Sequence, residues 1–215
     1  MTAQSAATNC AGRDWPMPIY QPKDQFYRKA REKGLPSRAA FKLEELLARY
    51  RLVKPDARIV DLGCAPGGWL AILAAAAPAV TVVGVDLVPC RVPAERVRVI
   101  TGDIREPAVQ QAVSETLGGR ADLITSDIAP KLSGIRAADE ARAFELLATA
   151  AEFAEQHLKP GGSMIAKVFM SEELRRFQTR LSARFAHVDL VHTQASRPGS
   201  RELYVVARRF DGGAR

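Results

Sequence analysis

The chain has 215 residues, of which 47% are hydrophobic, and its formal net charge at pH 7 is +7. This size and apolar fraction fit one globular domain with a full core, and the positive charge indicates an anionic partner without deciding the fold. Three cysteines without a Cys-x-x-Cys pair argue against a disulfide framework or a metal site. The first residues lack the apolar stretch of a secretion signal, so we expect a cytoplasmic protein that is not bound to a membrane.

The beginning of the chain divides into a tail and a basic segment. Residues 1–22 are small and polar and contain proline, which is typical of a flexible tail, and residues 23–215 are expected to form a single domain. This domain opens on an extension, residues 23–55, in which seven lysines and arginines between Lys23 and Lys42 outnumber two acidic residues, a net +5. Such a stretch with aromatic residues suits RNA, although an ordinary solvated helix has the same pattern. The candidate RNA-binding residues are Arg28, Lys29, Arg31, Lys33 and Arg38.

Helices and strands alternate through the rest of the chain. Ser37 can cap a helix that runs to about Arg51, with Lys42 at the border of its apolar face. We expect strands over residues 58–62, 80–86, 97–100, 122–125, 163–169, 187–192 and 203–207, a turn at 159–162, and further helices over 67–77, 107–117, 137–158 and 171–184. This order predicts an α/β fold, a seven-stranded and mostly parallel sheet with helices on both faces. The last two strands are joined by a loop without a helix and should be antiparallel.

The strongest local signal is the segment DLGCAPGGW, from Asp61 to Trp69, at the end of the first predicted strand. Ligands bind at this edge of an open α/β sheet, and glycines let the backbone approach them closely. Asp86 ends the next strand, where a carboxylate can accept hydrogen bonds from both ribose hydroxyls, and Asp103 follows the third strand, where it can meet an adenine amino group. The G-x-G-x-x-G spacing is absent, so an adenosyl cofactor without a pyrophosphate fits better than a dinucleotide. The candidate cofactor-binding residues are Gly63, Gly67, Gly68, Asp86 and Asp103.

Four segments together resemble the FtsJ/RlmE family of RNA ribose 2′-O-methyltransferases: DLGCAPGGW, SDIAPKLSG from Ser126, AKVF from Ala166 and SRELY from Ser200. The segment SRAAFKLEELL also matches, and the resemblance covers residues 24–210. It implies a Rossmann-like class I methyltransferase fold with an antiparallel last strand, S-adenosyl-L-methionine as the cofactor, and further cofactor contacts at Trp69 and Asp127. The catalytic residues that it implies are Lys42, Asp127, Lys167 and Glu202.

Two positions depart from the family pattern. Lys131 stands where asparagine is common, and Cys64 stands where alanine is common. Both are peripheral to the implied catalytic residues, although Lys131 could alter contacts with RNA.

The resemblance implies that the partner is large-subunit ribosomal RNA, methylated on the assembled or nearly assembled subunit, with the ribose of a uridine as the expected acceptor. We expect a monomer. The same four catalytic residues serve transfer RNA and mRNA cap enzymes, so transfer RNA remains an alternative substrate, while the compact chain leaves no room for a cap-binding module. A non-catalytic RNA-binding ribosome-assembly factor is the alternative from another class, and the glycine spacing disfavours an NAD-linked oxidoreductase.

Methyl transfer from a sulfonium to a hydroxyl is an in-line displacement that requires alignment, removal of a proton and control of charge. A lysine is ordinarily charged at neutral pH, so Lys167 can act as a general base only where its surroundings favour the neutral amine. A neighbouring Lys42 would favour that form, whereas Asp127 and Glu202 favour the ammonium. The sequence therefore leaves two roles for Lys167, a general base or a charged group that orients the hydroxyl.

Overall fold

The computed structural model describes residues 39–90, 92, 94–131, 133–171, 173–196 and 199–212. The predicted tail, the basic residues Arg28, Lys29, Arg31, Lys33 and Arg38, and the predicted cap at Ser37 lie outside the described residues.

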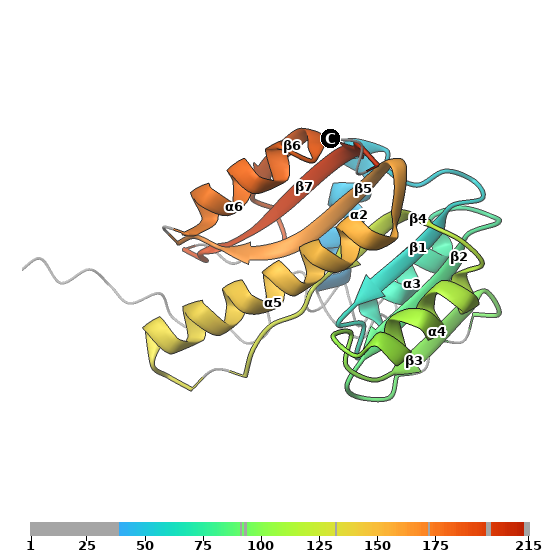
Figure 1. Ribbon diagram of the computed structural model, residues 1–215, viewed down its shortest axis with the longest axis horizontal. Helices are drawn as coiled ribbons and strands as arrows, with labels where there is room; N and C mark the ends of the chain where they lie inside the picture. The colour runs from blue at the N-terminus through green and yellow to red at the C-terminus, as the bar shows by residue number, and fades with distance from the viewer. Residues whose placement is uncertain are drawn as a thin grey trace, which may run out of the picture.

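A seven-stranded sheet with the order β3-β2-β1-β4-β5-β7-β6 forms the centre of the described chain (Figure 1). The strands are β1 (Arg58–Leu62), β2 (Thr81–Asp86), β3 (Val97–Thr101), β4 (Ala121–Ser126), β5 (Leu158–Phe169), β6 (Phe185–Val191) and β7 (Glu202–Phe210). The neighbours from β3 to β5 are parallel, and β7 is antiparallel to both β5 and β6. The predicted mostly parallel sheet with an antiparallel last strand is confirmed.

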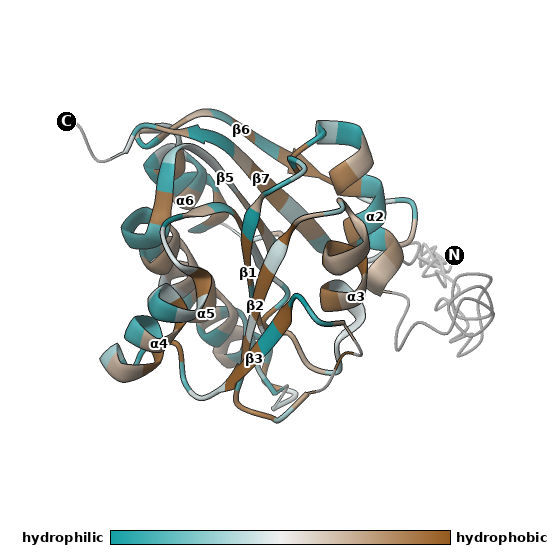
Figure 2. Cartoon of the chain, turned by 90° about the vertical axis from the view of Figure 1, so that its right-hand side faces the viewer, coloured by the Kyte–Doolittle hydropathy of each residue, from teal (hydrophilic) through white to brown (hydrophobic). Residues whose placement is uncertain are grey.

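Helices cover both faces of the sheet, as Figure 2 shows. They are α2 (Ala39–Tyr50), α3 (Gly68–Ala75), α4 (Pro107–Leu117), α5 (Arg136–His157) and α6 (Glu173–Ser182). One core lies under α2 and α3 and includes Leu43, Leu70 and Tyr204, and the other lies under α4, α5 and α6 and includes Val113 and Phe153. No described helix is long and apolar enough to cross a membrane.

Side chains along each strand alternate between the two cores. In β1, Ile59 belongs to the core under α2 and α3, while Val60 belongs to the core under α5. The same alternation places Asp61, Thr125 and Lys167 on the α2 side of the sheet. The polar residues at the carboxyl ends of three strands therefore share one face.

The structure differs from the sequence prediction at the start of β5. The predicted turn at residues 159–162 is wrong, because these residues belong to the strand. The ladder to β4 shifts register between Ala121 and Leu123, and Gly161 adopts a φ of +80°. A glycine in this conformation lets the strand absorb an irregularity without ending, which the proline and glycines alone could not distinguish from a turn.

Candidate active site

The loop between β1 and α3 owes its path to glycines. Gly63 has a φ of +75°, its backbone N–H donates to the Val85 carbonyl at 2.8 Å, and a Cβ there would lie 2.7 Å from Ile128 Cγ1. Gly67, with a φ of +103°, precedes the first residue of α3. The loop can therefore pack against the segment after β4 only because Gly63 has no side chain.

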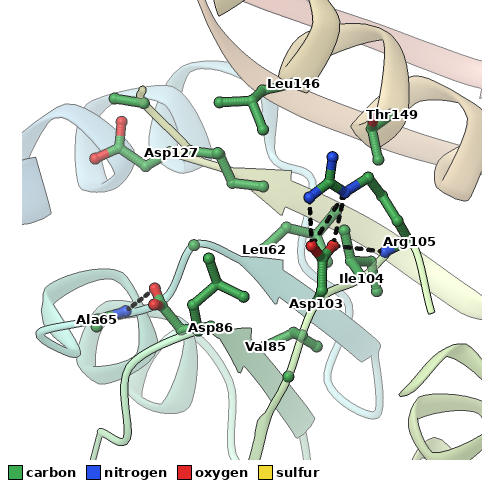
Figure 3. Close-up of a pocket in the computed structure, with 15 residues that line it drawn as sticks. Leu62, Ala65, Val85, Asp86, Asp103, Ile104, Arg105, Asp127, Leu146 and Thr149 are labelled. Carbon is green, nitrogen blue, oxygen red and sulfur yellow. Dashed lines mark hydrogen bonds and ion pairs between the residues drawn. The ribbon is translucent and has the colours of Figure 1, made fainter. Parts of the chain in front are cut away.

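A cavity of about 360 Å³ lies beside this loop, over the carboxyl ends of β1, β2 and β4 (Figure 3). Its volume falls within the roughly 300–1,000 Å³ of small-molecule sites. The residues that line it include Gly63, Asp86, Asp103, Arg105, Asp127 and Leu146. Four of the predicted cofactor residues thus meet at one cavity, while Gly67, Gly68 and Trp69 do not line it.

Asp86 is held in place at the cavity by two backbone donors. Its Oδ2 accepts from the Ala65 N–H and its Oδ1 accepts from the Val88 N–H, both at 2.9 Å. Because a carboxylate has about four acceptor positions, each oxygen can accept a further hydrogen bond. The geometry fits the two adjacent hydroxyls of a ribose.

Asp103 forms an ion pair with Arg105, a residue that the sequence prediction missed. The Arg105 Nε contacts both carboxylate oxygens at 3.0 Å, and the Arg105 backbone N–H donates to Oδ1 at 2.9 Å. The hydrogen bond from the Arg105 side chain, followed by the one from its backbone, lowers the pKa of Asp103. Figure 3 shows the pair at one wall of the cavity, so a ligand that reaches Asp103 also meets a guanidinium.

A second cluster, which we name the tetrad, combines Lys42 of α2, Asp127 after β4, Lys167 of β5 and Glu202 of β7. Lys42 Nζ pairs with Glu202 Oε1, and Lys167 Nζ lies 3.0 Å from Asp127 Oδ1 and 2.9 Å from the Asp127 carbonyl oxygen. The two lysine side chains are only 7% and 9% exposed, so each charge depends on its partner. The structure thus brings the four predicted catalytic residues together as two ion pairs, and Asp127 also lines the cavity.

Tyr204 connects the two ion pairs. Its fully buried hydroxyl donates to Glu202 Oε1 at 3.3 Å and lies 3.5 Å from Asp127 Oδ1. Burial, followed by the charges of these two carboxylates, raises the pKa of Tyr204 well above its ordinary value, so the hydroxyl remains a donor. The sequence prediction did not select Tyr204, although it lies in the SRELY segment and opposite Lys167 in the β5–β7 register.

Trp69 is buried and supports α2 rather than lining the cavity. Its Nε1–H donates to the Ala39 carbonyl at 2.9 Å, and its ring centroid lies 5.9 Å from that of Tyr204. This contact fixes the beginning of α2, the helix that carries Lys42, against the sheet.

Asp61, the first residue of the glycine-loop segment, is buried below the site. Its Oδ1 accepts from Thr125 Oγ1 at 2.7 Å, and its Oδ2 is buried with no hydrogen-bond partner among the described residues. Burial raises the pKa of Asp61 to about 8. A partly unsatisfied carboxyl in this position is neutral over much of the neutral range.

Two further observations concern metals and the positions that depart from the family pattern. Among the described residues, no group of three or more His, Cys, Asp and Glu side chains could hold a metal ion. Cys64 is buried, and a Cβ at Gly84 would lie 2.8 Å from its Sγ, whereas Lys131 is exposed in the loop after β4.

The chain is similar to known proteins over most of its length. The model of the FtsJ-like methyltransferase family matches residues 35–210. A protein named ribosomal RNA large subunit methyltransferase E from Anaeromyxobacter dehalogenans is 45% identical over 91% of this chain and 74% of its own length. A protein of the same name from Methanoculleus marisnigri is 43% identical over 88% of this chain and 93% of its own length.

A solved structure shares the fold. A Plasmodium falciparum protein, provisionally described as a ribosomal RNA methyltransferase, superimposes with a TM-score of 0.72 at 29% identity, over 81% of this chain and 97% of that one.

Proposed function

This chain belongs to the FtsJ-like methyltransferase family, and we propose that it transfers a methyl group from S-adenosyl-L-methionine to a ribose 2′-hydroxyl of large-subunit ribosomal RNA. The observation that carries the chemistry is the tetrad beside the cavity, with Asp127 belonging to both. The substrate is proposed because relatives at 45% and 43% identity are named for the large ribosomal subunit.

The cavity suits the cofactor by its volume and its acceptors. Asp86 would bind the ribose hydroxyls, and the wall formed by Asp103 and Arg105 would meet the adenine. When bound, S-adenosylmethionine supplies an electrophilic methyl group on a sulfonium, with a neutral thioether as the leaving group. Asp127 lines the cavity and forms an ion pair with Lys167. A hydroxyl bound by Lys167 would therefore lie next to that methyl group.

Lys167 would orient the acceptor hydroxyl as a charged group. An ammonium has three N–H donors. One donates to the Asp127 carbonyl oxygen at 2.9 Å, and Nζ lies 3.0 Å from Asp127 Oδ1 in an ion pair, so a donor remains for the substrate oxygen. That donor would align the hydroxyl and stabilise the negative charge that develops on its oxygen as the hydroxyl proton passes to solvent water. Lys42, paired with Glu202, adds a second buried positive charge to the same site. A general-base role for Lys167 would instead give a kcat that rises with pH until the amine is neutral, so the pH dependence of kcat separates the two roles.

RNA would be delivered by the basic segment that precedes and includes Lys42. Its candidate residues Arg28, Lys29, Arg31, Lys33 and Arg38 are close in sequence to the tetrad lysine. We propose the assembled large subunit as the substrate, because a chain of 215 residues offers little surface for reading sequence. We propose a uridine as the target on the basis of the resemblance to the FtsJ/RlmE family. The enzyme would act as a monomer in the cytoplasm.

A labelled-methyl assay tests the proposal with intact large subunits, free large-subunit RNA and transfer RNA offered side by side. Lys167→Ala should lower kcat by about 10²–10³, the usual cost of removing a donor that stabilises developing charge, while cofactor affinity measured by calorimetry stays unchanged. The matched control is Lys159→Ala, because Lys159 lies on the same strand and also pairs with a carboxylate, Asp122, but lies at the other end of β5. Near-normal turnover by Lys167→Ala would refute the catalytic role.

The same assay decides among the substrates. Preferred methylation of transfer RNA would overturn the proposed substrate and leave the chemistry intact, whereas RNA binding without any methyl transfer would identify an assembly factor.

Replacing Arg28, Lys29, Arg31 and Lys33 by alanine should flatten the salt dependence of RNA binding, by roughly 0.7 in slope for each phosphate that the variant no longer neutralises.

A further inference from the structure

The large apolar side chains that are exposed in the described part of the chain gather at one edge of the sheet. Leu87 and Val88, 69% and 58% exposed, follow β2, Ile135, 66% exposed, follows β4, and Met170, 51% exposed, follows β5. These loops all extend from the carboxyl ends of parallel strands, where the cavity and the tetrad lie. Leu87 lines the cavity, and Val88 adjoins it in the same loop. Ile135 and Met170 lie in other loops and form exposed apolar surface that the cofactor site does not explain.

Met170 follows β5 directly, next to the end of β7 that carries Glu202. Phe169 is paired with Glu202 in the β5–β7 ladder, and the ladder continues with the Met170 N–H, which donates to the Arg201 carbonyl at 3.0 Å. Met170 and Arg201 thus form the next step beyond Glu202, and Met170 is three residues beyond Lys167. Arg201 contacts Glu140 of α5, so it lies on the α5 side of this end of the sheet, whereas the tetrad lies on the α2 side. A nucleotide that adjoins the one whose ribose reaches Lys167 can therefore contact Met170 and Arg201.

Positive charge accompanies the apolar side chains. Arg201 Nη1 lies 2.7 Å from Glu140 Oε1, and Arg136 Nε lies 3.0 Å from the same oxygen. Two guanidiniums that share one carboxylate leave a net charge of +1, and the two arginine side chains are 44% and 75% exposed. Each guanidinium keeps donors that can bind a phosphate.

The residues directly before Ile135 are hydrogen-bonded to α5. Asp139 accepts hydrogen bonds from the Ser133 N–H at 2.8 Å, the Ser133 hydroxyl at 2.7 Å and the Gly134 N–H at 3.1 Å. The backbone hydrogen bond from Ser133, followed by the one from its hydroxyl, lowers the pKa of Asp139, so these hydrogen bonds persist at neutral pH. The side chain of Ile135 is therefore held in an exposed position immediately before α5.

We propose that Ile135, Arg136, Met170 and Arg201, which we name the α5-side strip, bind the RNA nucleotide that adjoins the methylated ribose. Arg136 and Arg201 bind its phosphate, and Ile135 and Met170 contact a base that is turned out of its stack. Sequence-specific RNA recognition commonly uses unstacked bases, and arginine matches phosphate geometry. The inference rests on the proposed function, because it assumes that RNA approaches the tetrad.

Substitutions of Arg201 and of its partner Glu140 should change RNA binding in opposite directions. Arg201→Ala removes a phosphate contact and should raise KM for large subunits by about three- to tenfold, at unchanged kcat and cofactor affinity. Glu140→Gln removes the competing carboxylate and should lower KM. The slope of log affinity against log salt for a mixed-sequence single-stranded RNA oligonucleotide should become shallower by about 0.7 in the first variant and steeper in the second.

The control is a similar arginine–carboxylate pair distant from the edge. Arg180 of α6 is 41% exposed and its Nη2 lies 3.2 Å from Glu155 Oε1. Arg180→Ala and Glu155→Gln should leave KM and the salt slope at their wild-type values. Met170→Ala should raise KM without changing the salt slope, because it removes an apolar contact and no charge.

The outcomes separate the strip from the proposed function. If Arg201→Ala and Met170→Ala methylate large subunits with the wild-type KM, the strip is refuted and the proposed function stands. If Arg201→Ala also lowers cofactor affinity, its effect is structural and the strip is again refuted. If the wild-type chain methylates no RNA, the proposed function fails, and the oligonucleotide salt slopes still decide whether the strip binds phosphate.

Discussion

Replacing Asp61 by asparagine should make the stability of the protein less dependent on pH. Asp61 is buried, and burial raises its pKa to about 8, whereas the same carboxyl in an unfolded chain has a pKa near 3.9. Between these values the folded protein holds a proton that the unfolded chain has released. The contribution of Asp61 to stability is therefore fully present below about pH 4 and is lost as the pH rises through about 8.

The magnitude follows from the size of the shift. Each pH unit between the two pKa values changes the free energy of unfolding by about 1.4 kcal/mol, so the wild-type protein should lose about 4 kcal/mol from this group between pH 5 and pH 8. Asparagine is neutral throughout this interval, and its side-chain oxygen can still accept the hydrogen bond from Thr125. The variant should therefore match the wild type near pH 5 to within about 1 kcal/mol and exceed its stability at pH 8.

Urea denaturation at unit intervals from pH 5 to pH 9 measures this difference. Other titrating groups, including the histidines, are common to both proteins and cancel when the two curves are subtracted. Asp56→Asn is the control, because Asp56 is an exposed aspartate in the turn before β1, and its curve should run parallel to that of the wild type. A difference between Asp61→Asn and the wild type that stays constant with pH would show that Asp61 is ionised in the folded protein and would refute the reasoning.

Three further substitutions test the site. Tyr204→Phe should lower kcat about tenfold and shift the pH dependence of kcat, at unchanged cofactor affinity. An unaltered pH profile would mean that the hydroxyl has a structural role alone. Arg105→Ala should weaken S-adenosylhomocysteine binding about threefold in calorimetry by releasing Asp103, while tighter binding would mean that the arginine competes with the adenine. Gly63→Ala should lower the free energy of unfolding by more than Gly118→Ala does. Both glycines have a positive φ, which costs alanine roughly 1–2 kcal/mol, but of the two only Gly63 has a described neighbour where the new Cβ would lie. Equal losses would contradict the close packing at Gly63.

The order of elements was accessible from the sequence because short apolar runs ended at polar residues. The run before Asp61 and the run before Asp86 became β1 and β2, and the helix-length segments between strands required parallel pairing. The glycine loop at the end of β1 then indicated the end of the sheet at which the cavity lies. These features depend on local composition and on connection length, which a sequence displays directly.

The pairing within the tetrad was not accessible in this way. Lys42 and Glu202 are 160 residues apart, and their contact depends on how α2 lies across the sheet and on the register that sets Phe169 opposite Glu202. Hydrophobic patterns specify which face of an element is buried but not which polar ends meet. For the same reason Tyr204 looks like an ordinary strand residue in the sequence. Its hydroxyl can be recognised as a contact between Asp127 and Glu202 only when the register of β5 and β7 is known.

The position of Asp127 explains how one site can hold two substrates. β4 is the central strand, and the chain reverses its direction of travel through the sheet between β1 and β4, so the connections diverge at their carboxyl ends and leave a crevice. The cavity opens on the β1 and β2 side of Asp127, and Lys167 contacts it from β5 on the other side. A methyl donor and a hydroxyl acceptor can therefore approach from opposite sides of a single residue. The strand order thus separates the two approaches to Asp127 independently of which side chains line them.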